Sequence, residues 1–184
     1  MKSLVCILSA ILIVITVSAQ EKKGSTLGFE IDALPFILGG YYGSMWIGSN
    51  HVRCRAVITQ VTTPQFLLDD GFTNNKIRVY AGIVDYFFKP GFEKWWVGSG
   101  LEYWRGSIQT NAKLSTEKYD QAIFTLGGGY AWRFHKRFYL NPWVAIHARL
   151  AGENKVLVDG KDLSPAAFIP EASIKVGWFF NIKR

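Results

Sequence analysis

The stretch FIPEASIKVGWFF, residues 168–180, decides the fold of this chain because its side chains alternate between two environments. The even-numbered positions from Phe168 to Phe180 are all apolar, whereas the odd-numbered positions include Glu171, Ser173 and Lys175. Successive side chains of a β-strand point to opposite faces, so this period of two predicts a strand. It is longer than the five or six residues of an ordinary globular strand, and a tilted strand crosses a bilayer with about 9–11. We therefore predict one strand of a closed barrel that is apolar outside and polar inside.

The same alternation recurs along the chain and predicts seven more strands. Six have a clear apolar phase, at 27–33, 52–59, 77–84, 95–104, 122–134 and 138–150, and one without a decisive phase is expected at 41–48. In each strand the apolar phase should face lipid, as for Ile77, Val79, Ala81 and Ile83. The fold class is thus all-β, an eight-stranded antiparallel up-and-down transmembrane barrel. A bulge at Gly39-Gly40, joining two strands into one, would leave seven strands and defeat this scheme.

The expected lipid-facing positions include residues from three of these strands: Leu126, Leu140, Val144, Ile174 and Val176. Connections are expected to alternate between short, at 49–50, 89–94 and 135–137, and long, at 62–75, 107–118 and 151–167. Short periplasmic turns and longer outer loops produce this asymmetry in membrane barrels. The connection at 35–40 is an exception, because it should be an outer loop and is small.

The first nineteen residues predict a secretory signal peptide. Lys2 provides a positive start, residues 4–17 are almost continuously apolar, and Val17-Ser18-Ala19 offers a cleavage site. We expect a signal peptide at 1–19, a short linker at 20–25 and an outer-membrane β-barrel domain at 26–184. The formal charge is +7, with basic residues scattered rather than grouped with aromatics, which argues against a nucleic-acid partner.

The chain resembles the small outer-membrane β-barrel domain proteins of Gram-negative bacteria. The resemblance lies in the signal peptide, the glycine-rich and aromatic-rich hairpins, and a final strand containing Ile174-Lys175-Val176-Gly177-Trp178-Phe179-Phe180. The residues Asn181 to Arg184 after Phe180 depart from the aromatic end usual in that family. The resemblance implies an eight-stranded barrel in the outer membrane, with membrane lipid as a partner, and it implies no single activity.

A soluble, secreted barrel of the lipocalin kind is the alternative, because alternation alone does not say which face is inside. The membrane orientation is favoured because the polar faces hold many glycines and few long charged residues, which suits a narrow lumen.

The predicted inner faces carry nearly balanced charge. Four acids (Glu30, Asp32, Glu102 and Glu171) stand against five bases (Arg53, Arg55, Arg78, Arg149 and Lys175). Charges in a low-dielectric interior must be paired. We predict that they form an ion-paired plug, with Arg78, Arg149 and Lys175 pairing with these carboxylates; a lumenal binding site is the alternative.

The histidines do not indicate catalysis. A lipid-hydrolysing site would need a His near a Ser and an acid at the outer rim. His51 and His135 fall at short turns, and His147 is predicted to face the lumen as a hydrogen-bonded residue. No metal-ligand spacing, phosphate-binding loop or dinucleotide motif is present, so no enzyme, metal or cofactor is expected.

Recognition is therefore expected in the outer loops. Residues 62–71 read as a short turn of helix that Thr63 can cap, with Phe66, Leu67 and Leu68 as a lid or as anchors for an extracellular protein or a hydrophobic small molecule. Asp159-Gly160 predicts a hairpin that extends the sheet above the membrane and offers an edge for strand addition. The predicted function is a structural or surface-interaction role; the alternative is uptake or sensing of a small hydrophobic ligand.

Overall fold

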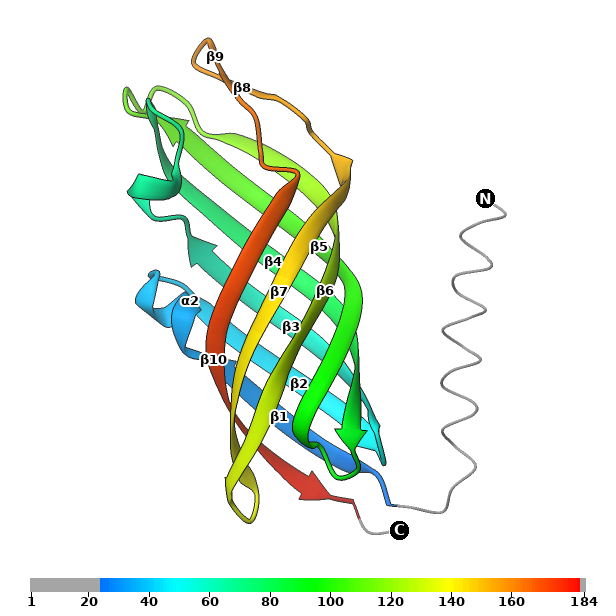
Figure 1. Cartoon of the computed structure of the whole chain (residues 1–184). Helices are drawn as coiled ribbons and strands as arrows, with labels where there is room; N and C mark the ends of the chain where they lie inside the picture. The colour runs from blue at the N-terminus through cyan, green and yellow to red at the C-terminus, as the bar shows by residue number, and fades with distance from the viewer. Residues whose placement is uncertain (1–23, 183–184) are drawn as a thin grey trace, which may run out of the picture.

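The computed structural model describes residues 24–182. The predicted signal peptide at 1–19 lies outside the described residues, as does most of the predicted linker. The first barrel strand begins at Thr26, and Ile182 N donates to Ser25 O over 2.7 Å, so both ends of the described chain lie together at one end of the barrel (Figure 1).

Eight antiparallel strands close into a barrel in the order β1-β10-β7-β6-β5-β4-β3-β2. The prediction of an eight-stranded barrel is confirmed. The strands are β1 (Thr26–Asp32), β2 (Tyr41–Ser49), β3 (Val52–Thr62), β4 (Phe72–Lys89), β5 (Glu93–Thr110), β6 (Glu117–His135), β7 (Phe138–Gly152) and β10 (Phe168–Asn181). The remaining elements are α2 (Ala33–Ile37), the 3-10 helix η1 (Gln65–Leu67), and a separate hairpin of β8 (Val156–Val158) and β9 (Lys161–Leu163).

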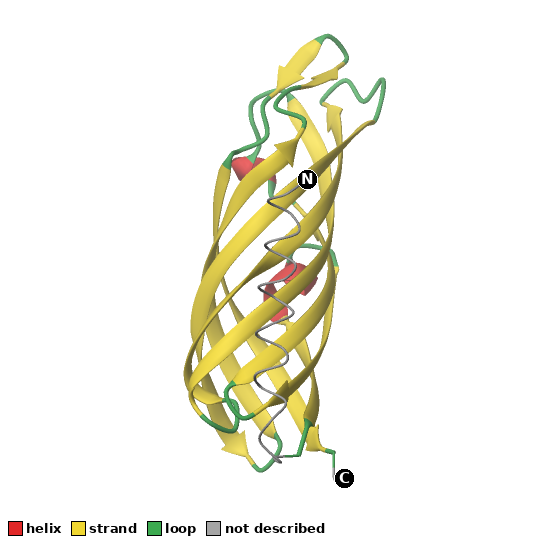
Figure 2. Cartoon of the chain, turned by 90° about the vertical axis from the view of Figure 1, so that its right-hand side faces the viewer, coloured by secondary structure: helices red, strands yellow, loops and turns green. Residues whose placement is uncertain are grey.

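The strands differ greatly in length, and this shapes the barrel. β4 has 18 residues and β6 has 19, whereas β1 has 7 and β2 has 9. α2 joins these two short strands; the Asp32 side chain caps it by accepting from Leu34 N over 3.0 Å. In Figures 1 and 2, α2 lies about halfway up the wall and η1 lies closer to the loop end. No helix among residues 24–182 is long and apolar enough to cross a membrane.

Two loop predictions need correction. The loop expected at 107–118 spans only residues 111–116, because the alternation of β5 and β6 continues to Thr110 and Glu117. The turn of helix expected at 62–71 forms as η1, but Thr63 does not cap it, because its N-cap position is Pro64, which makes no side-chain cap. Thr63 instead bonds to Asn75 through both its backbone and its hydroxyl. The hairpin at Asp159-Gly160 is confirmed, with both residues at positive φ, 46° and 77°, as a two-residue turn requires.

Six of the seven predicted strand phases are confirmed; the phase of β4 is wrong. On the outer surface Leu126, Val144 and Ile174 are more than half exposed, at 52, 61 and 52%, and Leu140 and Val176 share their phase. In β4 the apolar phase faces inward: Val79 and Ile83 are buried, and Tyr80 in the opposite phase is exposed. The reason is that β4 borders a hollow, apolar part of the interior, so apolar residues occupy its inner face.

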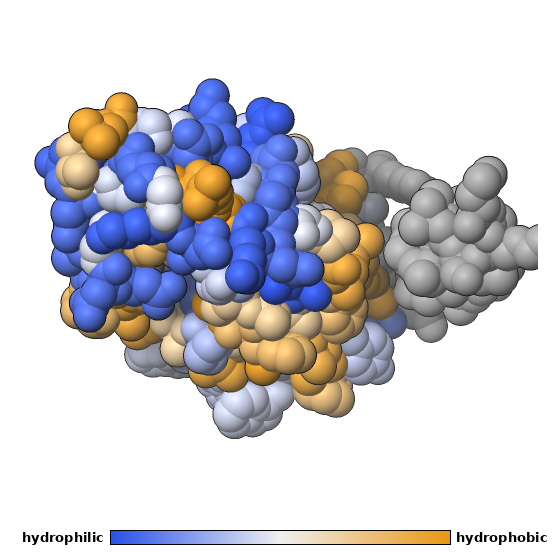
Figure 3. All heavy atoms as spheres, turned by 90° about the horizontal axis from the view of Figure 1, so that it is seen from above, coloured by the Kyte–Doolittle hydropathy of each residue, from blue (hydrophilic) through white to orange (hydrophobic). Residues whose placement is uncertain are grey.

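The outer surface and the loop end differ in polarity. Seen from above, hydrophilic residues gather over the loops, and hydrophobic residues lie on the barrel wall below them (Figure 3). This distribution matches a barrel wall in hydrocarbon with loops in water.

Candidate functional site

The interior has a filled lower half, at the end with the chain termini. Two arginines of β3 meet two carboxylates there. Arg53 contacts Glu30 at 2.9 Å and Asp85 at 2.7 Å, and Arg55 contacts Asp85 at 2.7 Å and Glu30 at 3.6 Å. All four side chains are at most 5% exposed. We call Glu30, Arg53, Arg55 and Asp85 the charge cluster. Such charges are tolerated in an interior because each one is paired.

Aromatic side chains surround the charge cluster. Tyr139 OH donates to Glu30 over 2.8 Å and accepts from Trp46 Nε1 over 3.0 Å. The Arg53 guanidinium lies 5.0 Å from the ring centre of Phe87, within cation–π range. The buried aromatic set is completed by Phe92, Trp96 and Phe179. The lower half is therefore packed with side chains.

The structure brings together only part of the predicted charge network. Glu30, Arg53 and Arg55 meet in the charge cluster, and their partner Asp85 was missed. Asp85 continues the phase of Ile77 to Ile83, so its charge was the sequence signal that this phase of β4 faces inward. Asp32 lies apart and accepts from Trp143 Nε1 over 2.9 Å and from the Ser173 hydroxyl.

The prediction that Arg78, Arg149 and Lys175 pair with carboxylates is wrong. Arg78 lies on the outer surface and donates to Gln60 over 3.0 Å, a consequence of the inverted phase of β4. Arg149 lies at the loop end and donates to the carbonyls of Glu153 and Pro165. Lys175 is buried, but its Nζ lies 3.5 Å from the ring centre of Trp143 and within 4 Å of no carboxylate of the described chain.

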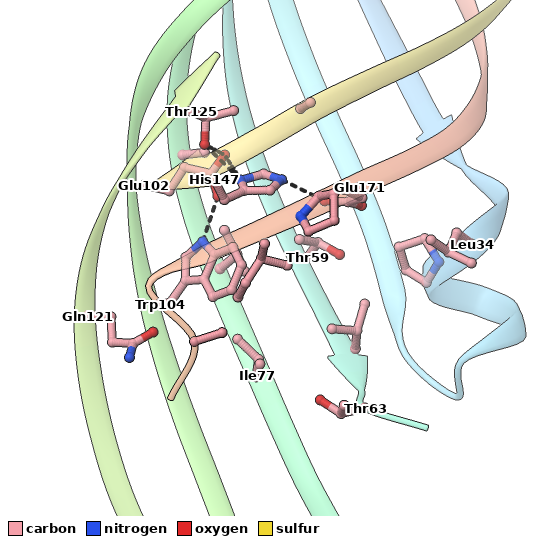
Figure 4. Close-up of a pocket in the computed structure, with 18 of the residues that line it drawn as sticks. Leu34, Thr59, Thr63, Ile77, Glu102, Trp104, Gln121, Thr125, His147 and Glu171 are labelled. Carbon is pink, nitrogen blue, oxygen red and sulfur yellow. Dashed lines mark hydrogen bonds and ion pairs between the residues drawn. The ribbon is translucent and has the colours of Figure 1, made fainter. Parts of the chain in front are cut away.

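A second polar group, higher in the barrel, surrounds His147. Its Nε2 lies 2.9 Å from Glu171 and its Nδ1 lies 2.8 Å from the Thr125 hydroxyl. Glu102 accepts from Thr125 over 2.7 Å and from Trp104 Nε1 over 2.6 Å. We call these five residues the histidine cluster (Figure 4). They come from β5, β6, β7 and β10, so only closure of the sheet assembles them.

The histidine cluster borders a cavity of about 570 Å³ in the outer half of the barrel. Residues of the inward apolar phase of β4 line one wall, and Val57 and Val61 of β3 continue it. Trp104 and Ile169 contribute further apolar surface, whereas Glu171 and Lys175 are polar groups at its boundary. A volume of roughly 300–1,000 Å³ with few polar groups is typical of small-molecule sites.

The hairpin of β8 and β9 covers the loop end of this cavity. Three apolar residues of the hairpin are buried against Phe72 of β4 and Tyr119 of β6: Val156, Val158 and Leu163. This hairpin forms its own two-stranded sheet, so the prediction that it extends the barrel sheet is wrong. Of the predicted loop contacts, Leu67 and Leu68 line the cavity, whereas Phe66 is 84% exposed. Among residues 24–182, no group of three or more His, Cys, Asp or Glu side chains is placed to hold a metal ion.

A closed antiparallel barrel with an apolar outer surface and a charge-bearing interior has the architecture of transmembrane β-barrels. Solved structures of outer-membrane proteins share it. A major outer membrane protein from Thermus thermophilus matches with a TM-score of 0.57 and 12% identity, over 87% of this chain and 100% of that chain. Neisserial surface protein A (NspA) matches with a TM-score of 0.53 and 11% identity, over 86% of this chain and 94% of that chain. The chain thus has the fold of a small outer-membrane barrel. No protein-family model and no curated protein matches it.

Proposed function

We propose that this protein is an outer-membrane β-barrel that binds a small, mainly apolar molecule in the outer half of its lumen. The observation that carries the proposal is the cavity of about 570 Å³, whose surface is mainly apolar and whose polar side chains include the histidine cluster. The apolar outer surface supports a position in the bilayer, with the short turns facing the periplasm and the long loops facing outward.

The filled lower half favours binding over conduction. An eight-stranded barrel is just wide enough to be filled by its own side chains. The charge cluster and its aromatic neighbours occupy the lumen below the cavity. A molecule in the cavity therefore has no open path to the periplasmic end. This supports the ligand alternative over a lumen plugged along its whole length.

The histidine cluster supplies the polar end of the proposed site. Glu171 is the accessible carboxylate of the histidine cluster, because its side chain is 32% exposed while that of Glu102 is 8% exposed. A hydroxyl or amine of the bound molecule could donate to it. Covalent catalysis is not favoured, because the Thr125 hydroxyl donates to Glu102 and so does not direct its proton at His147.

Filling the cavity tests the proposal. Ala81 lines the cavity from β4, and Ala81→Phe would place a ring in the empty volume. Native mass spectrometry of the protein released from detergent should show a retained small-molecule adduct for the wild type and its loss for Ala81→Phe. The matched control is Ala122→Phe, which adds the same ring on the outer surface and should keep the adduct. Equal adducts in all three proteins, or none in the wild type, would contradict the proposal.

A second function, recognition by the outer loops, rests on one observation. Phe66 is 84% exposed beside the polar loop end, where it could anchor an extracellular protein. Phe66→Ser should then abolish binding of vesicles bearing the protein to an extracellular protein while leaving the cavity adduct unchanged. Unchanged surface binding would remove this candidate.

A further inference from the structure

The barrel wall is incomplete beside the cavity. β1 pairs with β10 only from Thr26 opposite Asn181 to Asp32 opposite Lys175. β10 continues beyond this point to Phe168, and there it pairs only with β7. With 7 residues, β1 is also shorter than the roughly 9–11 that a strand needs to cross the hydrocarbon region. The gap therefore begins partway up the wall, above α2.

The unpaired edge of β10 carries a proline, Pro170, on the side that faces the gap. Its odd-numbered residues bond to β7, since Phe179 N donates to Arg137 O and Ala167 O accepts from Arg149 N. Its even-numbered residues bond to the β1 side, since Ile182 N donates to Ser25 O. Pro170 is even-numbered and lies beyond the end of β1, so one of the positions that would direct an N–H into the gap has none, whereas Phe168 and Ala172 in the same phase keep theirs. Proline at an open edge avoids an unsatisfied donor.

The other side of the gap presents apolar side chains. α2 satisfies much of its backbone internally, and its Phe36 and Ile37 are 53% and 78% exposed. A short helix can lie at the depth of lipid chains because its backbone bonds within the segment. This position fits the middle height at which α2 lies in Figures 1 and 2.

The cavity reaches the outer surface through this gap. Phe168 and Pro170 belong to the outward phase of β10 and are exposed, yet both line the cavity. Leu34 and Leu38 of the α2 segment line it from the opposite side. A cavity confined to the lumen would touch only the inward phase. The packed hairpin of β8 and β9 meanwhile covers the loop end.

We propose that the cavity receives an acyl chain of an outer-leaflet lipid, which enters sideways above α2, past the open edge of β10. This inference rests on the proposed function and specifies its ligand class. The apolar rim and the covered loop end both favour entry from the membrane over entry from water, because an acyl chain then stays in apolar surroundings along its path.

Photolabelling in vesicles tests the route. The full protein is reconstituted in phosphatidylcholine vesicles that contain a phosphatidylcholine with a diazirine on one acyl chain, and labelled residues are mapped by mass spectrometry. The outward residues Leu126 and Val144 should be labelled in every sample. The inward residues Ile77 and Val79 should also be labelled, whereas the inward lower-half residues Phe87 and Phe179 should not.

Two comparisons make the result decisive. Ala81→Phe should lose labelling of Ile77 and Val79 while keeping that of Leu126, and Ala122→Phe should behave as the wild type. A diazirine-bearing free fatty acid added from water serves as the second probe, because it could also enter at the loop end. If the fatty acid labels Ile77 and the phospholipid does not, lateral entry of a membrane lipid is overturned and the binding function stands. If neither probe labels Ile77 or Val79 and no adduct is retained in native mass spectrometry, the binding function fails as well.

Discussion

At the scale of single residues, the charge cluster stabilises the barrel through mutual pairing. Asp85 accepts hydrogen bonds from Nε of both Arg53 and Arg55 over 2.7 Å. This one carboxylate therefore compensates two buried guanidinium groups. Removing one member of a buried ion pair leaves its partner's charge buried and uncompensated. The loss of folding stability is therefore larger than the stability that the intact pair contributes.

Asp85→Asn should therefore destabilise the barrel by about 3–5 kcal/mol. Urea unfolding in lipid vesicles, followed by the shift in gel mobility on heating, measures this change. The control Arg78→Gln removes a charge from the outer surface, where the guanidinium bonds to Gln60, and should stay within about 0.5 kcal/mol of the wild type. A loss of stability in the control as large as that in Asp85→Asn would contradict the pairing argument.

Asp159, in the turn between β8 and β9, should respond to acid. Hydrogen bonds from the hydroxyls of Thr110 and Ser115 hold the pKa of Asp159 below its usual value. Because the folded-state pKa is lowered, the stabilisation is present above the unfolded pKa, about 3.9, and is lost as the pH falls through the folded pKa. The hairpin should therefore be cleaved faster by protease once the pH falls below the folded-state pKa of Asp159.

Limited proteolysis with pepsin across acid pH measures this opening. Asp159→Asn is the control, since it keeps a residue that tolerates positive φ but removes the titrating group. Asp162, whose carboxylate lies 3.6 Å from the Lys155 ammonium, is a second acid on the same hairpin and remains in the variant. An identical acid step in Asp159→Asn would therefore assign the effect to another group.

At the scale of elements, alternation in a strand sets the side that can accept a charge. Val144 lies on the outer surface of β7 and is 61% exposed, whereas His147 of the same strand is buried inside. In β4 alternation alone does not identify the outer face. Its inward residues are apolar because they line the cavity.

Val144→Arg should cost about 2–4 kcal/mol if this position lies near the bilayer midplane. The measurement is again urea unfolding in vesicles. Ala112→Arg, in the exposed loop between β5 and β6, carries the same side chain above the wall and should have an effect near zero. Equal effects at the two positions would contradict the proposed position of β7 in the bilayer.

At the scale of the whole molecule, three levels follow one another along the barrel axis: a packed lower half, a cavity, and a covering hairpin. Folding should depend mainly on the closed wall and the packed half, because outer loops contribute little to a closed barrel. Retention of a ligand should depend on the cover.

Replacing residues 154–165 by a tight turn should leave heat-modifiable migration intact while weakening the retained adduct in native mass spectrometry. The physical reason is that Leu163 would no longer line the cavity, and Val156 and Val158 would no longer pack on Phe72 and Tyr119 at its loop end. Leu157→Ser, at an exposed position of the same hairpin, keeps these three residues and serves as the control. A shortened hairpin that retains the adduct fully would show that the cover is not needed.

The sequence by itself determined the closed barrel, the strand count and six strand phases, because a period of two is a local property of the backbone and a membrane imposes it on every strand. It also predicted the hairpin at Asp159-Gly160, since positive φ at both turn positions is a local demand. It placed Glu30, Arg53 and Arg55 on the inner face, but the identity of their partner required the phase of β4.

Only the tertiary structure decided the cavity, the histidine cluster and the gap in the wall. Each of these features depends on where the strands end along the barrel axis. The register between neighbouring strands sets those positions, and no single segment of sequence contains it. Lys175 opposite Asp32 marks the end of β1, and nothing in either local sequence states that pairing. His147, Glu102 and Glu171 likewise lie in three separate strands, and only closure of the sheet brings them into contact.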